Sequence, residues 1–133
     1  KLCIGKFIVT QIIANIFKES PLVDQIMVIG EHEKFTSALI SPNFKYFDGW
    51  KTSRNITFAD NDDLVQNQQV QSLFSDEVSR FNKRLSTWER ITRFRLVSDE
   101  WSPSTGELSP TLKLRRSFIR DKYRAFVDQI YMK

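Results

Sequence analysis

Positive charge is concentrated in one segment near the end of this 133-residue sequence. Between residues 113 and 124 (KLRRSFIRDKYR) lysines and arginines recur, and Asp121 is the only acid. Lys113, Arg115 and Arg116 stand where a predicted turn leads into a predicted helix. Backbone N–H groups at a helix N-terminus attract anions, and the helix dipole disfavours cations there unless an anion is bound. The segment could therefore bind a phosphate or a carboxylate, although from the pattern alone a solvated basic face is the simpler interpretation.

No complete catalytic site is visible elsewhere. The sequence has no glycine-rich phosphate loop, no cluster with metal-ligand spacing and no nucleophile beside a base, so we predict no metal site. The single histidine, His32, falls in a predicted turn, where a surface role is the simpler interpretation. The single cysteine, Cys3, is more simply a small packing residue than a nucleophile. One cysteine cannot form an internal disulfide, which suits a reducing compartment.

The elements that would position the basic segment are short. Apolar spacing and turn residues predict helices over residues 11–19, 44–51, 68–85 and 116–131, and strands over 25–30, 36–40 and 93–97. The first two strands are expected to form a hairpin. Residues 101–113 are expected to be a loop, because Pro103, Gly106 and Pro110 supply turn chemistry. The prediction is an α+β fold, in which a small sheet of short, mainly antiparallel strands is flanked by helices.

The composition fits one domain with a genuine core. Of the residues, 41% are hydrophobic and 11 are Phe, which argues against general disorder. The longest apolar runs are too short to span a bilayer, and the first residues do not resemble a signal peptide. The net charge of +4 is modest.

The C-terminal half resembles a known family. The run of residues 106–116 (GELSPTLKLRR) is similar to the late motif of AMP-forming long-chain fatty-acyl-CoA synthetases, in the adenylate-forming superfamily. In the small C-terminal domain of those enzymes, a turn carrying this motif presents one lysine to the active site. The Pro-Thr-Leu-Lys form, here Pro110 to Lys113, is typical of the long-chain branch. Further matches at residues 25–30, 33–35, 38–44, 67–82 and 89–94 extend the resemblance over nearly the whole chain.

The first residues resemble the same domain less closely. The family has a Ser-Gly-Gly-Lys-like turn there, whereas this sequence has Cys3 and Ile4 before Gly5 and Lys6. The resemblance implies that Gly5 and Lys6 belong to a loop that lines the tunnel for the pantetheine arm of CoA. The family's hinge residue would lie before Lys1.

The resemblance implies that residues 1–133 are the single C-terminal domain of a larger ligase, whose large N-terminal adenylation domain is covalently linked but absent from this chain. It implies that Lys113 is the catalytic lysine of adenylation. Arg115 and Arg116 are further candidates, for contact with a phosphate or with the large domain. Long-chain fatty acid, ATP and CoA would be the substrates, with ATP and Mg²⁺ bound mainly by the large domain. The isolated chain is expected to be inactive and to hold no cofactor.

The resemblance also implies a cytoplasmic enzyme that could associate peripherally with the inner membrane surface. Two other interpretations stay open, a non-catalytic interaction domain and a basic nucleic-acid-binding domain. The small charge excess and the lack of an aromatic–basic strand motif argue against nucleic acid, which we do not expect as a partner.

Overall fold

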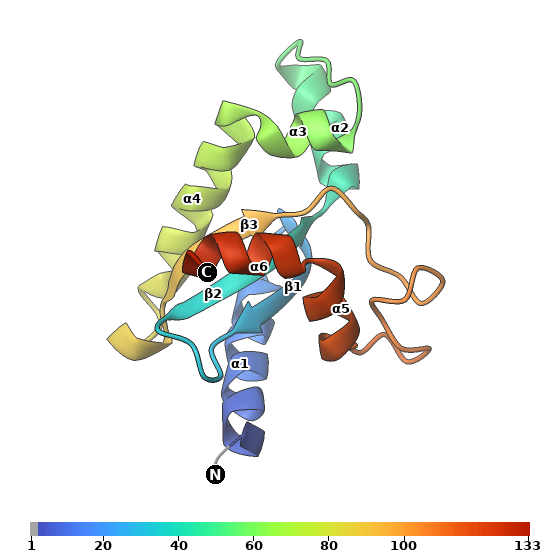
Figure 1. The fold of residues 1–133 in the computed structure, drawn as a ribbon. Coiled ribbons are helices and arrows are strands. Elements are labelled where there is room, and N and C mark those ends of the chain that lie inside the picture. Colours follow the sequence, from blue (N-terminus) through green and yellow to red (C-terminus); the bar gives the residue numbers. More distant parts are fainter. Residues whose placement is uncertain (1–2) are drawn as a thin grey trace.

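A computed structural model describes the backbone of residues 3–133 and the side chains of residues 9–133. Helices and strands are interspersed along the chain (Figure 1). In order, the elements are α1 (Cys3–Phe17), β1 (Val23–Ile29), β2 (Thr36–Pro42), α2 (Phe44–Ser53), α3 (Asn61–Gln66), α4 (Gln68–Asn82), a 3-10 helix (Thr87–Glu89), β3 (Ile91–Leu96), α5 (Arg116–Lys122) and α6 (Arg124–Tyr131).

The three strands form one mixed sheet in the order β1-β2-β3. β1 and β2 form the expected antiparallel hairpin, with Ile26 opposite Ile40. β3 pairs with β2 in parallel, with Ala38 opposite Phe94. The parallel direction follows from the helical crossover between the two strands, because a chain that crosses over through α4 re-enters the sheet in the same direction. The α+β class is confirmed, and the single parallel pair is a detail that the strand periodicity did not indicate.

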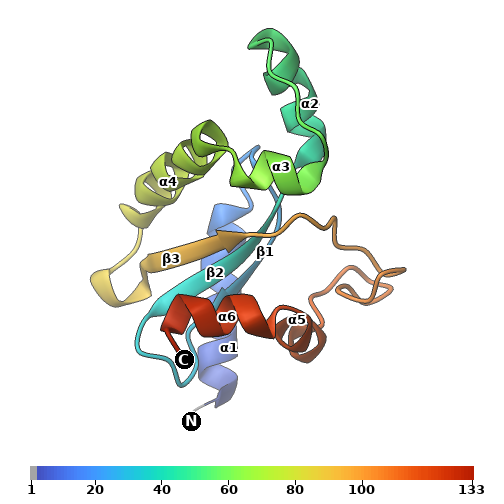
Figure 2. The same ribbon diagram turned by 45° about the horizontal axis from the view of Figure 1, so that its top comes forward.

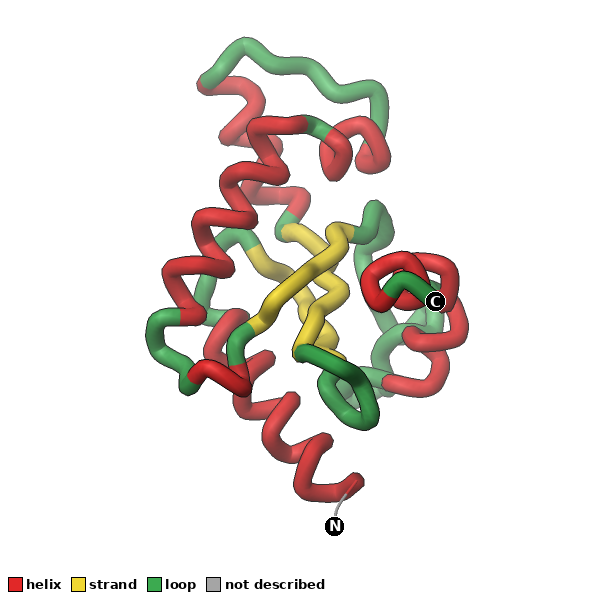
Figure 3. Tube along the Cα trace, turned by 60° about the vertical axis from the view of Figure 1, so that its left-hand side comes forward, coloured by secondary structure: helices red, strands yellow, loops and turns green. Residues whose placement is uncertain are grey.

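The sheet lies between two layers of helices. Along β1, Ile26 and Val28 face a core formed with α1, α2, α3 and α4, while Met27 and Ile29 face a second core formed with α5 and α6. This alternation follows from the two-residue period of a strand. Figure 3 shows the sheet between α1 and α4 on one side and α5 and α6 on the other, and α2 and α3 lie beyond one end of the sheet (Figure 2).

Two predicted helix boundaries were wrong. Helix α1 begins at Cys3 rather than near Gln11, since no proline interrupts residues 3–17. The predicted helix over residues 116–131 is divided at Tyr123, whose backbone angles (φ −106°, ψ 26°) leave the helical range. The apolar spacing continues through this break, because Ile119, Tyr123 and Val127 are all buried in the second core. Periodicity therefore could not indicate the division.

Candidate functional site

The predicted loop before the last helices is a tight hairpin. Leu108 and Leu114 form an antiparallel bridge. The N–H of Ser109 donates to the carbonyl of Lys113 at 2.8 Å, and the N–H of Arg115 donates to the carbonyl of Glu107 at 2.8 Å. These bonds form a short ladder at the base of the hairpin, which projects beside α5 (Figure 2). The backbone around Lys113 is therefore held by local hydrogen bonds.

Lys113 lies at the end of the hairpin turn. The turn closes through a 2.8 Å bond from the N–H of Leu112 to the carbonyl of Ser109, and the N–H of Lys113 donates to Oγ of Ser109 at 3.1 Å. Leu112 adopts a left-handed conformation (φ 66°), so the chain reverses sharply just before Lys113. Lys113 is exposed, and its ammonium has no hydrogen-bond or ion-pair partner among the described residues.

A groove of about 510 Å³ separates this hairpin from α1 and β1. Lys113 and Arg116 line it from the hairpin side, and Lys18 and Gln25 line it from the other side. Three basic residues and no acidic residue line this groove. Lys18 donates a hydrogen bond to Gln25 at 3.4 Å. Neither residue was predicted to belong to the site, because both lie 88 or more positions before Lys113 and the sequence carries no local signal of this proximity. The lining is suited to an anion.

The base of the hairpin is anchored by a buried carboxylate. Glu107 is fully buried. Its Oε1 accepts hydrogen bonds from Oγ1 of Thr105 at 2.5 Å and from the N–H of Ser102 at 3.2 Å, and its Oε2 pairs with Nζ of Lys122 at 2.5 Å. Burial alone would raise the pKa of Glu107, but these hydrogen bonds outweigh burial and lower it. Glu107 is therefore ionised at neutral pH.

Lys122 and Tyr123 connect this anchor to the start of the loop. Lys122 Nζ lies 3.6 Å from Oδ2 of Asp99. The hydroxyl of Tyr123 donates to Asp99 at 2.7 Å and accepts from the indole N–H of Trp101 at 3.0 Å. Burial would lower the pKa of Lys122, but Glu107 and Asp99 raise it above its usual value. Burial and the hydrogen bond to Asp99 raise the pKa of Tyr123.

The two predicted arginines have partners inside the domain. The guanidinium of Arg116 donates to the carbonyl of Val28 at 2.8 Å and pairs with Glu31 at 2.9 Å. Arg115 is exposed, donates to the carbonyl of Gly106 at 2.9 Å and lies over the ring of Phe118. These contacts explain why cations stand at the start of α5. A role for either arginine at a phosphate or a domain interface stays a prediction.

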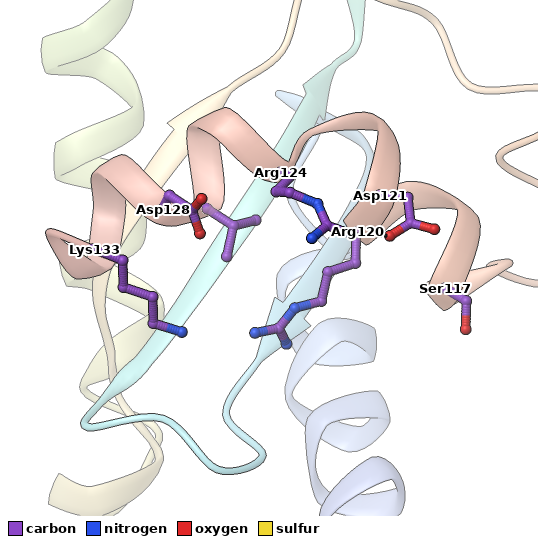
Figure 4. Close-up of a pocket in the computed structure, with 7 residues that line it drawn as sticks. Ser117, Arg120, Asp121, Arg124, Asp128 and Lys133 are labelled. Atoms are coloured by element: carbon purple, nitrogen blue, oxygen red, sulfur yellow. Dashed lines mark hydrogen bonds and ion pairs between the residues drawn. The ribbon is translucent and has the colours of Figure 1, made fainter.

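Arg120 and Arg124, the remaining arginines of residues 113–124, pair with acids, and Lys133 shares the partner of Arg120. Arg120 and Lys133 both pair with Glu33, and Figure 4 shows their side chains reaching toward one another across a pocket on the outer face of α5 and α6. Arg124 pairs with Asp121 at 2.7 Å. Within residues 113–124, all of which the structure describes, Lys113 alone has a charged group without a partner. The apparent basic face is thus mostly an internal ion-pair network.

Gly5 and Lys6 fall in the first turns of α1, so the predicted loop there is helical backbone. Their side chains lie outside the described residues. No group of three potential metal ligands occurs among the residues that the structure describes. In the same part of the chain, no helix is both long and apolar enough to cross a membrane.

Known proteins resemble this chain in sequence and in fold. A family profile described as the AMP-binding enzyme C-terminal domain matches residues 2–133. The long-chain-fatty-acid–CoA ligase FadD15 of Mycobacterium tuberculosis is 29% identical over 130 residues, which cover 97% of this chain and 22% of that protein. The human long-chain-fatty-acid–CoA ligase 6 is 29% identical over 136 residues, covering 98% of this chain and 19% of its own length. The chain thus spans about a fifth of these relatives.

A solved structure shares the fold. The A domain of the carboxylic acid reductase from Segniliparus rugosus, in complex with AMP and a co-purified carboxylic acid, superposes with a TM-score of 0.71 at 20% identity. The match covers 92% of this chain and 18% of that one.

Proposed function

Because this chain belongs to the family of AMP-binding enzyme C-terminal domains, and because its relatives are named long-chain-fatty-acid–CoA ligases, we propose that the full-length protein joins a long-chain fatty acid to CoA at the expense of ATP. In the first step a carboxylate oxygen of the fatty acid attacks the α-phosphorus of ATP, which forms an acyl-adenylate and releases pyrophosphate. In the second step the sulfur of CoA attacks the acyl carbonyl carbon, the thiol proton is lost, and AMP leaves.

In this proposal Lys113 serves the first step. Two anionic groups, the carboxylate and the α-phosphate, must be brought together, and a cation placed between them stabilises the transition state. A lysine ammonium is a compact charge with three donors on a flexible stem. The observation that carries the proposal is that Lys113 is the exposed, unpartnered cation on a hairpin whose base is anchored.

The other parts of the reaction are assigned to the rest of the protein. The described residues offer no metal-ligand cluster, so we place Mg²⁺ and most contacts to ATP in the large N-terminal domain. Mg²⁺ would neutralise charge on the phosphates when bound there. We further propose that the domain rotates between the two steps and that the segment of Gly5 and Lys6 then faces the pantetheine arm of CoA.

The test is fatty-acid-dependent exchange of pyrophosphate into ATP by the full-length protein. Lys113→Ala is expected to slow exchange about a hundredfold or more, equivalent to about 2.7 kcal/mol of barrier. Lys45→Ala is the matched control, because Lys45 is an exposed lysine on α2, and it should exchange at the wild-type rate. Equal exchange by wild type and Lys113→Ala would contradict the role of Lys113. No exchange by either would favour a non-catalytic interaction domain.

A further inference from the structure

Glu107 and Lys122 form a carboxylate–ammonium pair behind the hairpin that carries Lys113. We propose that Glu107 and Lys122 are positioning residues, which hold the Lys113 hairpin in register against α5 so that the ammonium of Lys113 is presented at a fixed place. The proposal rests on the proposed role of Lys113 in adenylation. Neither residue needs to touch a substrate.

The burial of Glu107 indicates a specific tether. The side chain has no exposed surface, and a carboxylate buried in this way is unfavourable unless it is fully paired. Each of its oxygens is used. Oε1 binds the preceding turn, through Thr105 and Ser102, and Oε2 binds Lys122 on α5. The pair therefore connects the loop to the helix at one defined point.

The backbone of the same residue carries this constraint to Lys113. The carbonyl of Glu107 accepts from Arg115, the next ladder step joins Leu108 to Leu114, and the next joins Ser109 to Lys113. A displacement of Glu107 would shift this ladder as a unit. Lys113 is the first residue of the ladder after the turn, so its backbone would move with the ladder.

Lys122 also secures the other end of the loop. Its ammonium lies between Glu107 and Asp99, and Asp99 accepts a hydrogen bond from Tyr123. Both ends of the loop are thus joined to the junction of α5 and α6. An apolar contact at this place would exclude water, but it would not fix the direction of the loop as these hydrogen bonds do.

The experiment measures both half-reactions in the full-length protein. Lys122→Met removes the ammonium and keeps an apolar stem of similar length. Since a misplacement of about 1 Å can cost about a hundredfold in rate, we expect the maximal rate of pyrophosphate exchange to fall about ten- to a hundredfold, with the KM for ATP changed less than about threefold. Thioester formation from added acyl-adenylate should stay within about twofold of wild type. Arg124→Met is the matched control, because it breaks an exposed pair next to the same junction.

A double variant separates positioning from general damage. If Lys122 acts through Lys113, the double variant of Lys122→Met with Lys113→Ala should exchange no more slowly than Lys113→Ala alone. Lys122→Arg, which keeps a cation, should recover most of the exchange rate. If Lys122→Met does not fold, the neutral pair Glu107→Gln with Lys122→Met provides the same comparison.

The outcomes that overturn the proposal differ from those that overturn the role of Lys113. Three results would each refute positioning: wild-type exchange by a folded Lys122→Met, equal losses of rate in both half-reactions, or losses that multiply in the double variant. In each case a slow Lys113→Ala would leave the adenylation role of Lys113 in place. Wild-type exchange by Lys113→Ala would refute both.

Discussion

Gly106 is the position where a single methyl group should disturb the hairpin most. Its φ is +100°, which L-residues rarely adopt, and a Cβ added there would lie 2.6 Å from Cζ of Phe118 and 3.0 Å from Cε2. The backbone strain costs about 1–2 kcal/mol, and displacing the ring adds about 1–2 kcal/mol, at the low end of the range for overpacking because Phe118 is only partly buried. Gly106→Ala should therefore lower the free energy of unfolding by about 2–4 kcal/mol.

Urea unfolding of the 133-residue chain, followed by circular dichroism, measures this change. The matched control is Gly49→Ala, because Gly49 lies inside α2, has no positive φ and has nothing within 4 Å of an added Cβ. That substitution should stabilise the chain by about 0.5–1 kcal/mol. In a Phe118→Ala background the cost of Gly106→Ala should fall to the backbone part alone. A loss below about 0.5 kcal/mol, or the same loss with and without the Phe118 ring, would refute the reasoning.

Three further predictions concern the core and the buried polar groups. Glu107→Gln should lower the free energy of unfolding by about 1–2 kcal/mol at pH 7, a value discounted because the side chain of Lys122 is 34% exposed. The pKa of Glu107 is lowered in the folded state, so its contribution to stability is present above the usual carboxyl pKa and is lost as the pH falls through the folded-state pKa. The difference in stability from wild type should therefore shrink in acid unfolding curves. Phe74→Ala should cost about 3–5 kcal/mol in the same unfolding assay, because this ring on α4 is fully buried in the first core. A cost under about 1 kcal/mol would mean that this core is loosely packed. Burial raises the pKa of Tyr131 to about 12, so its phenol should ionise well above free tyrosine in an ultraviolet titration, and Tyr131→Phe should remove that transition.

Local patterns were sufficient for the parts of the fold that depend on neighbouring residues. The β1–β2 hairpin and the turn before Lys113 follow from short apolar runs separated by polar or proline-containing turns. The short helix α3 was not predicted. Asp60 caps its start by accepting a hydrogen bond from the N–H of Asp63. An Asp three residues before a second Asp was the signal that could have indicated it.

Features that depend on distant residues could not be predicted in this way. The basic segment suggested an anionic ligand, but Arg116 and Arg120 meet carboxylates on the β1–β2 turn, Glu31 and Glu33, that lie more than 80 residues earlier in the chain. A sequence shows the sign of each charge but not which opposite charge folds beside it. The same limit applies to β3, whose parallel pairing is decided by the path of the chain through α4.

The contrast between a fixed ladder and a free ammonium has a consequence for time scales. Exposed side chains change rotamer in picoseconds to nanoseconds, loops rearrange in nanoseconds to microseconds, and whole domains move in microseconds to milliseconds. Because the backbone on both sides of Lys113 is hydrogen-bonded, the freedom left to this residue belongs to the fastest class. Its ammonium can sample every position within reach on a time scale far shorter than that of a domain motion. The capture of an anion in the groove would therefore be limited by the arrival of that anion and not by the ordering of the hairpin.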